Sequence, residues 1–235
     1  MALSRAIWCE ICFSKVEQTG KGRLRMELSD AYIASFIPER DELLLEMEQY
    51  AAENHVPIMQ LAGIESLNQL LRIQNPKSIL EIGTAIGYSA IRMAQALPEC
   101  NIVTIERDEN RVQLAKQFIA RSEVASRIHV IEGDALEVDI ESIQSTFDAV
   151  FIDAAKGQYM KFFEKYAPLV PSGGVLYIDN MYMHGLSDLD IKEVPRRKRT
   201  MIRNLKTFSE WIMAHPNYTS AFFPVGDGLL ICLKR

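Results

Sequence analysis

The stretch Ser78-Ile79-Leu80-Glu81-Ile82-Gly83-Thr84-Ala85-Ile86-Gly87 joins a short, mostly apolar run to a turn that contains two glycines. Runs of this kind, when helices follow them, are typical of buried strands in a parallel sheet. Gly83 and Gly87 allow the backbone to turn sharply and to approach a ligand closely. Because such sheets bind ligands beyond the carboxyl ends of their strands, we expect a binding site at this turn.

The same alternation of strand and helix continues along the chain. Helices are expected before it, from Ser29 to Pro38, at 41–54 and at 58–73, and then at 87–97, 108–122, 137–145, 157–168 and 196–214. Strands are expected at 78–82, 101–106, 127–131, 147–153, 174–179, 219–223 and 229–233. Only the turn Gly226-Asp227-Gly228 separates the last two strands, so they must be antiparallel. The predicted fold is α/β, a doubly wound Rossmann-like sheet with an antiparallel last strand and N-terminal helices.

The composition is that of an ordinary globular protein with one sizeable core. The chain has 235 residues, of which 48% are hydrophobic and 24% charged, and its net charge is −5. A polyanionic partner would therefore need a local basic patch. No apolar run approaches the ~20 residues of a membrane span. Isolated cysteines such as Cys100 and Cys232, with no recognisable signal peptide, favour a reducing, cytoplasmic location.

Residues 1–25 are interpreted as an N-terminal arm, which could be an upstream extension, ahead of a domain that covers residues 26–235. The arm contains Cys9 and Cys12 in a C-x-x-C pair. A zinc site would need a second pair or nearby histidines, and the next histidine is His55. We therefore favour an incidental pair.

The donor loop, residues 81–89, departs from the dinucleotide-binding pattern G-x-G-x-x-G. Ala85 stands where the second glycine would be, and Glu81 precedes the turn. A carboxylate there repels a pyrophosphate but suits the ammonium group of a methionine moiety. The residues thus favour S-adenosylmethionine, and an NAD dehydrogenase is the disfavoured alternative.

The next two strands end in further acidic residues. Glu106 can accept hydrogen bonds from both ribose hydroxyls, although NAD enzymes use the same device. Asp134 either accepts from the adenine amine or caps a helix, and the sequence leaves both interpretations open.

Polar side chains also end the fourth and fifth predicted strands of the parallel set. Asp153 follows one strand, and Asp179 and Asn180 follow the other. Adjacent strands lie about 4.8 Å apart, so these oxygen-bearing side chains should converge. Two carboxylates and an amide suit a hard cation such as Mg²⁺. The alternative is that both aspartates are merely solvated turn residues.

Lys156 lies three residues after Asp153 and is the candidate base. A lysine beside a bound cation has a lowered pKa and can take a proton. Asp153 and Lys156 are therefore the predicted catalytic pair. The expected reaction is attack of a cation-bound hydroxyl on the sulfonium methyl group, with Lys156 accepting or steering the proton.

Several of these motifs together resemble the cation-dependent O-methyltransferases that include the catechol and caffeoyl-CoA O-methyltransferases. The resemblance runs from about Ser29 to the C-terminus and implies the methyltransferase variant of the fold and a homodimer. It implies metal ligands at Asp153, Asp179 and Asn180. It also implies donor contacts at Ile58, Gly83, Tyr88, Glu106, Asp134 and Asp153. Glu81, Ser89, Gly133 and Ala135, which lie in the same loops, are further predicted donor-binding residues.

Within that family, the chain is most similar to enzymes of Gram-positive bacteria that methylate 5-hydroxyuridine at the wobble position of tRNA. The segments that carry this similarity are 55–59, 81–93, 153–159 and the basic run Arg196-Arg197-Lys198-Arg199. The partner implied is a tRNA anticodon loop, which the basic run would contact at phosphates. A solvated helix start is the alternative for that run. Small catechol-like or caffeoyl-CoA-like phenols are the alternative acceptors, and a non-catalytic binding protein is a third hypothesis.

Overall fold

The computed structural model describes residues 30–139 and 146–235. The arm, with Cys9 and Cys12, therefore lies outside the described residues. The chain divides into two units at Glu39 and Arg40, which are described separately. The described part of the first unit contains α1 (Asp30–Ala34), followed by a turn in which Phe36 N–H donates to the Ile33 carbonyl at 3.1 Å.

The second unit alternates helices and strands as the sequence predicts. Its helices are α2 (Glu42–Glu53), α3 (Leu61–Gln74), α4 (Tyr88–Ala96), α5 (Glu109–Arg121), η1 (Ala125–Arg127), η3 (Lys156–Gln158), α6 (Tyr159–Tyr166), η4 (Ala167–Leu169), η5 (Arg196–Lys198) and α7 (Arg199–Met213). Its strands are β1 (Ser78–Ile82), β2 (Asn101–Glu106), β3 (Ile128–Glu132), β4 (Ala149–Ile152), β5 (Val175–Ile178), β6 (Tyr218–Phe223) and β7 (Leu229–Lys234).

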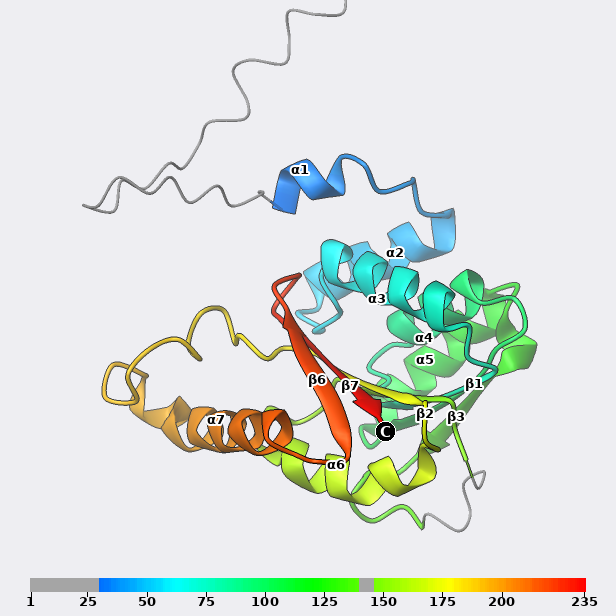
Figure 1. Cartoon of the computed structure of the whole chain (residues 1–235). Helices are drawn as coiled ribbons and strands as arrows, with labels where there is room; N and C mark the ends of the chain where they lie inside the picture. The colour runs from blue at the N-terminus through cyan, green and yellow to red at the C-terminus, as the bar shows by residue number, and fades with distance from the viewer. Residues whose placement is uncertain (1–29, 140–145) are drawn as a thin grey trace, which may run out of the picture. The chain divides into compact units, whose positions relative to one another are not determined.

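The strands form one seven-stranded sheet in the order β3-β2-β1-β4-β5-β7-β6 (Figure 1). The first five strands in chain order pair in parallel, whereas β7 is antiparallel to both β5 and β6. The predicted doubly wound sheet with an antiparallel last strand is confirmed. The chain order reverses at β1, between β2 and β4, which is the switch point where such sheets bind ligands.

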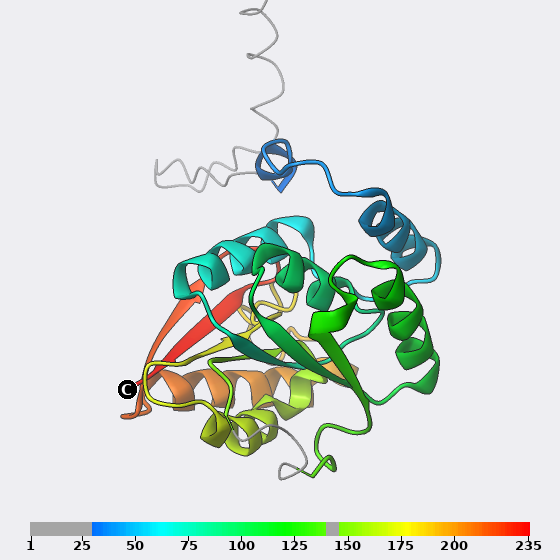
Figure 2. The same ribbon diagram turned by 90° about the vertical axis from the view of Figure 1, so that its right-hand side faces the viewer.

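Helices cover both faces of the sheet (Figures 1 and 2). Alternate strand residues serve the two cores, because successive side chains point to opposite faces. Ile79 and Phe151 pack in the core of α2 to α5, whereas Leu80 and Ile152 pack in the core of α6 and α7. No helix in the described ranges combines the length and the apolar character that crossing a membrane requires.

Several helix boundaries differ from the prediction. The helix expected from Ser29 to Pro38 covers only Asp30–Ala34, and the helix expected at 157–168 is divided into η3, α6 and η4. The helix predicted from residue 58 begins at Leu61, because Gln60 has extended backbone angles (φ −61°, ψ 145°). Residues 57–60 are therefore free to line a cavity. The segment 196–214 begins as one turn of 3-10 helix, η5, before α7. The helix predicted at 137–145 falls mostly outside the described residues, and Ala135 to Glu137 form a turn.

Candidate active site

A cavity of about 540 Å³ lies at the carboxyl ends of β1, β2, β4 and β5, where the topology predicts a ligand. Most residues predicted for donor and metal binding line it, from several separate segments. They are Ile58, Gly83, Tyr88, Ser89, Glu106, Gly133, Asp134, Ala135, Asp153, Lys156, Asp179 and Asn180. Glu81 and the basic run 196–199 do not line it.

The donor loop has a backbone that glycine permits. Gly83 has a φ of +105°, and a Cβ built on it would lie 2.1 Å from the carbonyl oxygen of Asp153. Gly87, also at positive φ, is the N-cap of α4. The loop therefore packs its backbone directly against the end of β4, which brings the two predicted halves of the site together.

Glu106 is held rigidly at the cavity wall. Its carboxylate accepts three backbone N–H bonds, from Ala85 at 2.9 Å and from Arg107 and Asp108 at 3.0 Å each. A carboxylate fixed in this way presents its remaining lone pairs in one direction, which suits a pair of ribose hydroxyls.

Asp134 serves the turn that follows β3 and also lines the cavity. Its Oδ1 accepts from the backbone N–H of Leu136 at 2.9 Å, and its Oδ2 lies 3.4 Å from an Arg107 guanidinium nitrogen. One oxygen of the side chain thus caps the turn after β3, and the other lies beside the Arg107 guanidinium.

Glu81 does not make the direct donor contact that the sequence suggested. The side chain is fully buried in β1 and accepts hydrogen bonds from the hydroxyls of Ser89 and Thr104, each at 2.5 Å. Its two oxygens are therefore engaged by protein groups. Glu81 supports the donor loop from beneath, through Ser89, rather than facing a ligand.

Burial raises the pKa of Glu81 to about 7 from its ordinary 4.5, although both hydroxyl bonds oppose the shift. The native state then becomes less stable as pH rises from about 4.5 to about 7, because only the unfolded chain ionises freely. We expect Glu81→Gln to remove this slope, which amounts to on the order of 3 kcal/mol at roughly 1.4 kcal/mol for each pKa unit. Urea unfolding of both proteins between pH 4.5 and 8 measures it. Parallel stability curves would show that Glu81 titrates normally.

The opposite end of the cavity gathers Asp153, Asp179 and Asn180. The Asn180 amide nitrogen donates to Asp153 Oδ1 at 2.7 Å and to Asp179 Oδ2 at 3.0 Å. Burial raises the pKa of both carboxyls, and the Asp153 charge adds to burial in raising that of Asp179 to about 7. An amide donor thus lies between a buried acid, Asp179, and a partly buried one, Asp153, at a point where a positive charge would be strongly favoured.

Lys156 and Tyr159 border the same end. The Lys156 charge opposes the rise in the pKa of Asp153 and Asp179, so the ammonium lies within electrostatic range of both. The Tyr159 hydroxyl is buried and donates to the Asp179 backbone carbonyl at 2.9 Å. Burial and the neighbouring carboxylates raise the pKa of Tyr159 well above 10, so it remains a neutral donor.

Four charged or titratable residues of the cavity wall were not predicted as site residues. Arg107 and Arg111 lie on the wall with Asp134, and His184 and Asp227 lie on it with Asp179. The sequence does contain Asp227 in the Gly226-Asp227-Gly228 turn, but as a turn signal only. Arg107 could have been predicted as a wall residue, because it directly follows Glu106 at the end of the second strand.

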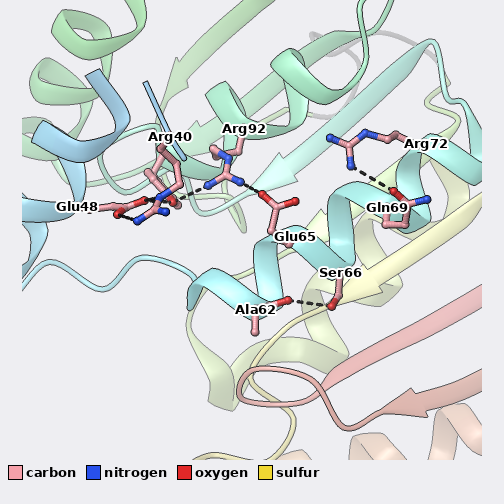
Figure 3. Close-up of polar contacts among 9 residues, drawn as sticks. Arg40, Glu48, Ala62, Glu65, Ser66, Gln69, Arg72 and Arg92 are labelled. Carbon is pink, nitrogen blue, oxygen red and sulfur yellow. Dashed lines mark hydrogen bonds and ion pairs between the residues drawn. The ribbon is translucent and has the colours of Figure 1, made fainter. Parts of the chain in front are cut away.

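A charged network holds the helices around the donor loop (Figure 3). Arg40 forms two hydrogen bonds of 2.9 Å with Glu48, which also accepts from the Tyr88 hydroxyl at 2.6 Å. Arg92, which is buried, donates to that hydroxyl at 2.8 Å and pairs with Glu65. The network ties α2 and α3 to α4, whose first residue, Tyr88, lines the cavity.

The basic run lies beside the site rather than in it. Arg196 and Arg197 are exposed on η5, and Lys198 is partly exposed. Arg199, the last residue of the run, is partly engaged by the protein, because its guanidinium donates to the backbone carbonyls of Val194 and Lys192. It stabilises the loop before α7, so at most part of it remains for a ligand. The Asn204 amide of α7 donates to the Gly157 carbonyl at 3.0 Å, which fixes this helix against the segment carrying Lys156.

Comparison with known proteins agrees with this geometry. The family described as O-methyltransferase matches residues 34–235. Caffeoyl-CoA O-methyltransferase 1 of Arabidopsis thaliana is 31% identical over 212 residues, which cover 85% of this chain and 81% of the plant enzyme. Tapetum-specific methyltransferase 1 of the same plant is 31% identical over 225 residues, 91% of this chain and 96% of that protein.

Solved structures agree in fold and in donor. A caffeoyl-CoA O-methyltransferase proposed for Staphylococcus aureus has 37% identity and a TM-score of 0.82, covering 88% of this chain and 99% of that one. An O-methyltransferase of Bacillus cereus, solved with S-adenosylhomocysteine, has 28% identity and a TM-score of 0.76, covering 88% and 96%. The NAD-dependent and non-catalytic alternatives are therefore set aside. The chain belongs to the O-methyltransferase family and is an S-adenosylmethionine-dependent O-methyltransferase.

Proposed function

We propose that the chain is a divalent-cation-dependent O-methyltransferase whose acceptor carries a hydroxyl group beside a second oxygen, as catechol-like and caffeoyl-CoA-like phenols do. The observation that carries the proposal is the meeting of Asp153, Asp179 and Asn180 at one end of the cavity that the donor loop opens. The names of the relatives support phenolic acceptors.

The donor end of the cavity would hold S-adenosylmethionine. Glu106 would accept hydrogen bonds from the ribose hydroxyls, Asp134 would face the adenine, and Gly83, Tyr88 and Ser89 would surround the methionine moiety. Ile58, Gly133 and Ala135 form further parts of the cavity wall, and Asp153 would contact both the donor and the cation. The bound donor supplies an electrophilic methyl group on a sulfonium centre.

Asp153, Asp179 and Asn180 fit a cation such as Mg²⁺, because a buried carboxylate, a partly buried one and an amide are a hard oxygen donor set. A cation held there would bind both acceptor oxygens and make the hydroxyl more acidic. Lys156, in its neutral amine form, would accept the hydroxyl proton at Nζ while the acceptor oxygen bonds to the methyl carbon and the carbon–sulfur bond breaks, releasing S-adenosylhomocysteine. The walls of the cavity would hold the acceptor oxygen in line with the methyl group.

A second candidate acceptor is 5-hydroxyuridine of a tRNA anticodon loop, whose 5-hydroxyl and O4 are also neighbouring oxygens. The observation that favours it is the position of η5, where Arg196 and Arg197 are exposed on the element that begins α7, beside the Lys156 segment. Phosphate contacts there would orient an RNA strand without reading its sequence.

One experiment separates the two acceptors. The wild-type chain and an Arg196→Ala/Arg197→Ala double variant are given free catechol, which carries no phosphate, and tRNA that contains 5-hydroxyuridine. Each is assayed with Mg²⁺ and with chelator. If RNA is the acceptor, 5-methoxyuridine forms in the tRNA. The double variant then methylates tRNA about tenfold or more slowly than the wild type, because each lost phosphate contact weakens RNA binding.

If a phenol is the acceptor, catechol is methylated equally by both proteins and tRNA is not. Activity that chelator leaves intact contradicts the proposed cation in either case. The proposal also includes a homodimer in the cytoplasm, which sedimentation velocity and fractionation of cells would test.

A further inference from the structure

The segment 57–60, here called the strap, forms part of the cavity wall without belonging to a helix or a strand. All four of its residues line the cavity, and they lie in the connection between α2 and α3. Among the described residues, the backbone groups of Pro57, Ile58 and Met59 take part in no backbone–backbone hydrogen bond. The position of the strap therefore depends on the helices on either side of it, together with the packing of the buried Met59 side chain.

Both of these helices are connected through one hydroxyl group, that of Tyr88 at the start of α4. Glu48 of α2 accepts from the Tyr88 hydroxyl at 2.6 Å, and Arg92 of α4 donates to the same hydroxyl at 2.8 Å. The Arg92 guanidinium also pairs with Glu65 of α3 (Figure 3). Because a hydroxyl has a single proton, its donation to Glu48 leaves its lone pairs for Arg92, so the direction of each hydrogen bond is fixed.

Glu48 is a charged acceptor in a partly buried position. Its side chain is 25% exposed and also pairs with Arg40, and the Arg92 side chain is 7% exposed. Burial would raise the pKa of Glu48, but the hydrogen bonds from Arg40 and Tyr88 outweigh burial, so the pKa lies below its usual value of 4.5. Glu48 is therefore ionised at neutral pH, and a charged acceptor makes a stronger hydrogen bond than a neutral one.

We propose that Glu48, which does not itself line the cavity, sets the affinity for the methyl donor by holding the Tyr88 hydroxyl. Tyr88 lines the cavity and is 2% exposed, so a shift of its ring would move the first turn of α4 as well. The same hydrogen bond holds α2, and with it one end of the strap. Glu48 is thus a positioning residue that acts through Tyr88 on two parts of the cavity wall. The inference rests on the donor position proposed above, but not on the acceptor or the cation.

The test titrates the full chain with S-adenosylhomocysteine by calorimetry, with neither cation nor acceptor present. Glu48→Ala removes the acceptor of the Tyr88 hydroxyl, and Tyr88→Phe removes the hydroxyl but keeps the ring. We expect each change to weaken binding by about tenfold, because a hydrogen bond to a charged group is lost. Glu46→Ala is the matched control, because Glu46 also lies on α2 and pairs with an arginine, Arg121, but at an exposed position. The control should leave the affinity within about twofold of the wild type.

Further variants separate positioning from a general loss of stability. Glu48→Gln keeps an oxygen that accepts from the Tyr88 hydroxyl, so it should restore binding to within about threefold of the wild type. The Glu48→Ala/Tyr88→Phe double variant should bind about as weakly as Tyr88→Phe, because both changes remove one contact. Additive losses in the double variant, equal losses in Glu48→Gln and Glu48→Ala, or wild-type affinity in Glu48→Ala would each overturn the inference. Wild-type affinity in Tyr88→Ala, which removes the ring from the wall, would refute the proposed donor position as well.

Discussion

Replacing Asp179 with asparagine is expected to lower methyl transfer by about 10³-fold or more while donor binding stays close to that of the wild type. The residue is 5% exposed, and its side chain shares the Asn180 amide with Asp153, so its charge would act on the proposed cation at short range. Metal stabilisation of a developing oxyanion is worth several kcal/mol, and each 1.36 kcal/mol is about tenfold in rate. Initial rates with saturating donor and the identified acceptor measure the loss.

Two measurements make this result specific. Calorimetric binding of S-adenosylhomocysteine should be nearly unchanged, because Asp179 is a predicted cation ligand and not a predicted donor contact. Raising Mg²⁺ should partly restore the rate of Asp179→Asn if the defect is weak cation binding. A rate within tenfold of the wild type would mean that Asp179 is an ordinary buried turn residue and that Asp153 and Asn180 serve another purpose.

The convergence of Asp153, Asp179 and Asn180 could be predicted because it follows from sheet topology alone. Each residue comes directly after a strand, and β4 and β5 pair in parallel with Ile152 opposite Ile178. A register read from apolar runs is therefore enough to place the three side chains at one edge. The same reasoning places Gly83, which follows β1, and Glu106, which ends β2, at this edge of the sheet.

The direction of Glu81 could not be predicted, because it depends on partners from two other segments. Ser89 reaches it from α4 and Thr104 from β2, so both carboxylate oxygens are used before any ligand arrives. An acidic residue next to a glycine turn looks the same in sequence whether it faces a ligand or a hydroxyl pair. Arg199 is similar, since its carbonyl partners at Val194 and Lys192 exist only once the preceding loop has folded back.

The contact between Asp227 and His184 could not be predicted either, since the two residues are far apart in the chain. Their contact requires the positive-φ backbone at Asn180, Met183 and His184, which local propensity disfavours and only the packed turn enforces. Gly228 shows how tight that packing is, because a Cβ there would lie 2.8 Å from the Tyr182 ring. Residues that reach the cavity wall through such loops are thus the hardest to predict from the sequence.

The second large effect is expected from Gly83→Ala, which should abolish measurable donor binding and lower the Tm by about 10 °C. The added Cβ would lie 2.1 Å from the Asp153 carbonyl oxygen, at a φ of +105°, so the donor loop and the end of β4 must separate. Left-handed backbone costs a non-glycine residue about 1–2 kcal/mol, and overpacking adds about 1–3 kcal/mol. A total near 3 kcal/mol corresponds to roughly 10 °C for a domain of this size. Differential scanning calorimetry and titration with S-adenosylhomocysteine measure the two effects.

Gly173→Ala is the matched control, because Gly173 also has positive φ, +86°, but nothing lies within 4 Å of its built Cβ. It should show the backbone cost alone, about 1 kcal/mol and roughly 3 °C, with donor affinity unchanged. The difference between the two variants then isolates the close approach of the donor loop to β4. If Gly83→Ala behaved like Gly173→Ala, the loop would have room to relax, and its contact with the Asp153 carbonyl would not be what shapes the donor site. A selective loss in Gly83→Ala would show that one glycine permits the donor loop and the proposed cation end to share a single cavity.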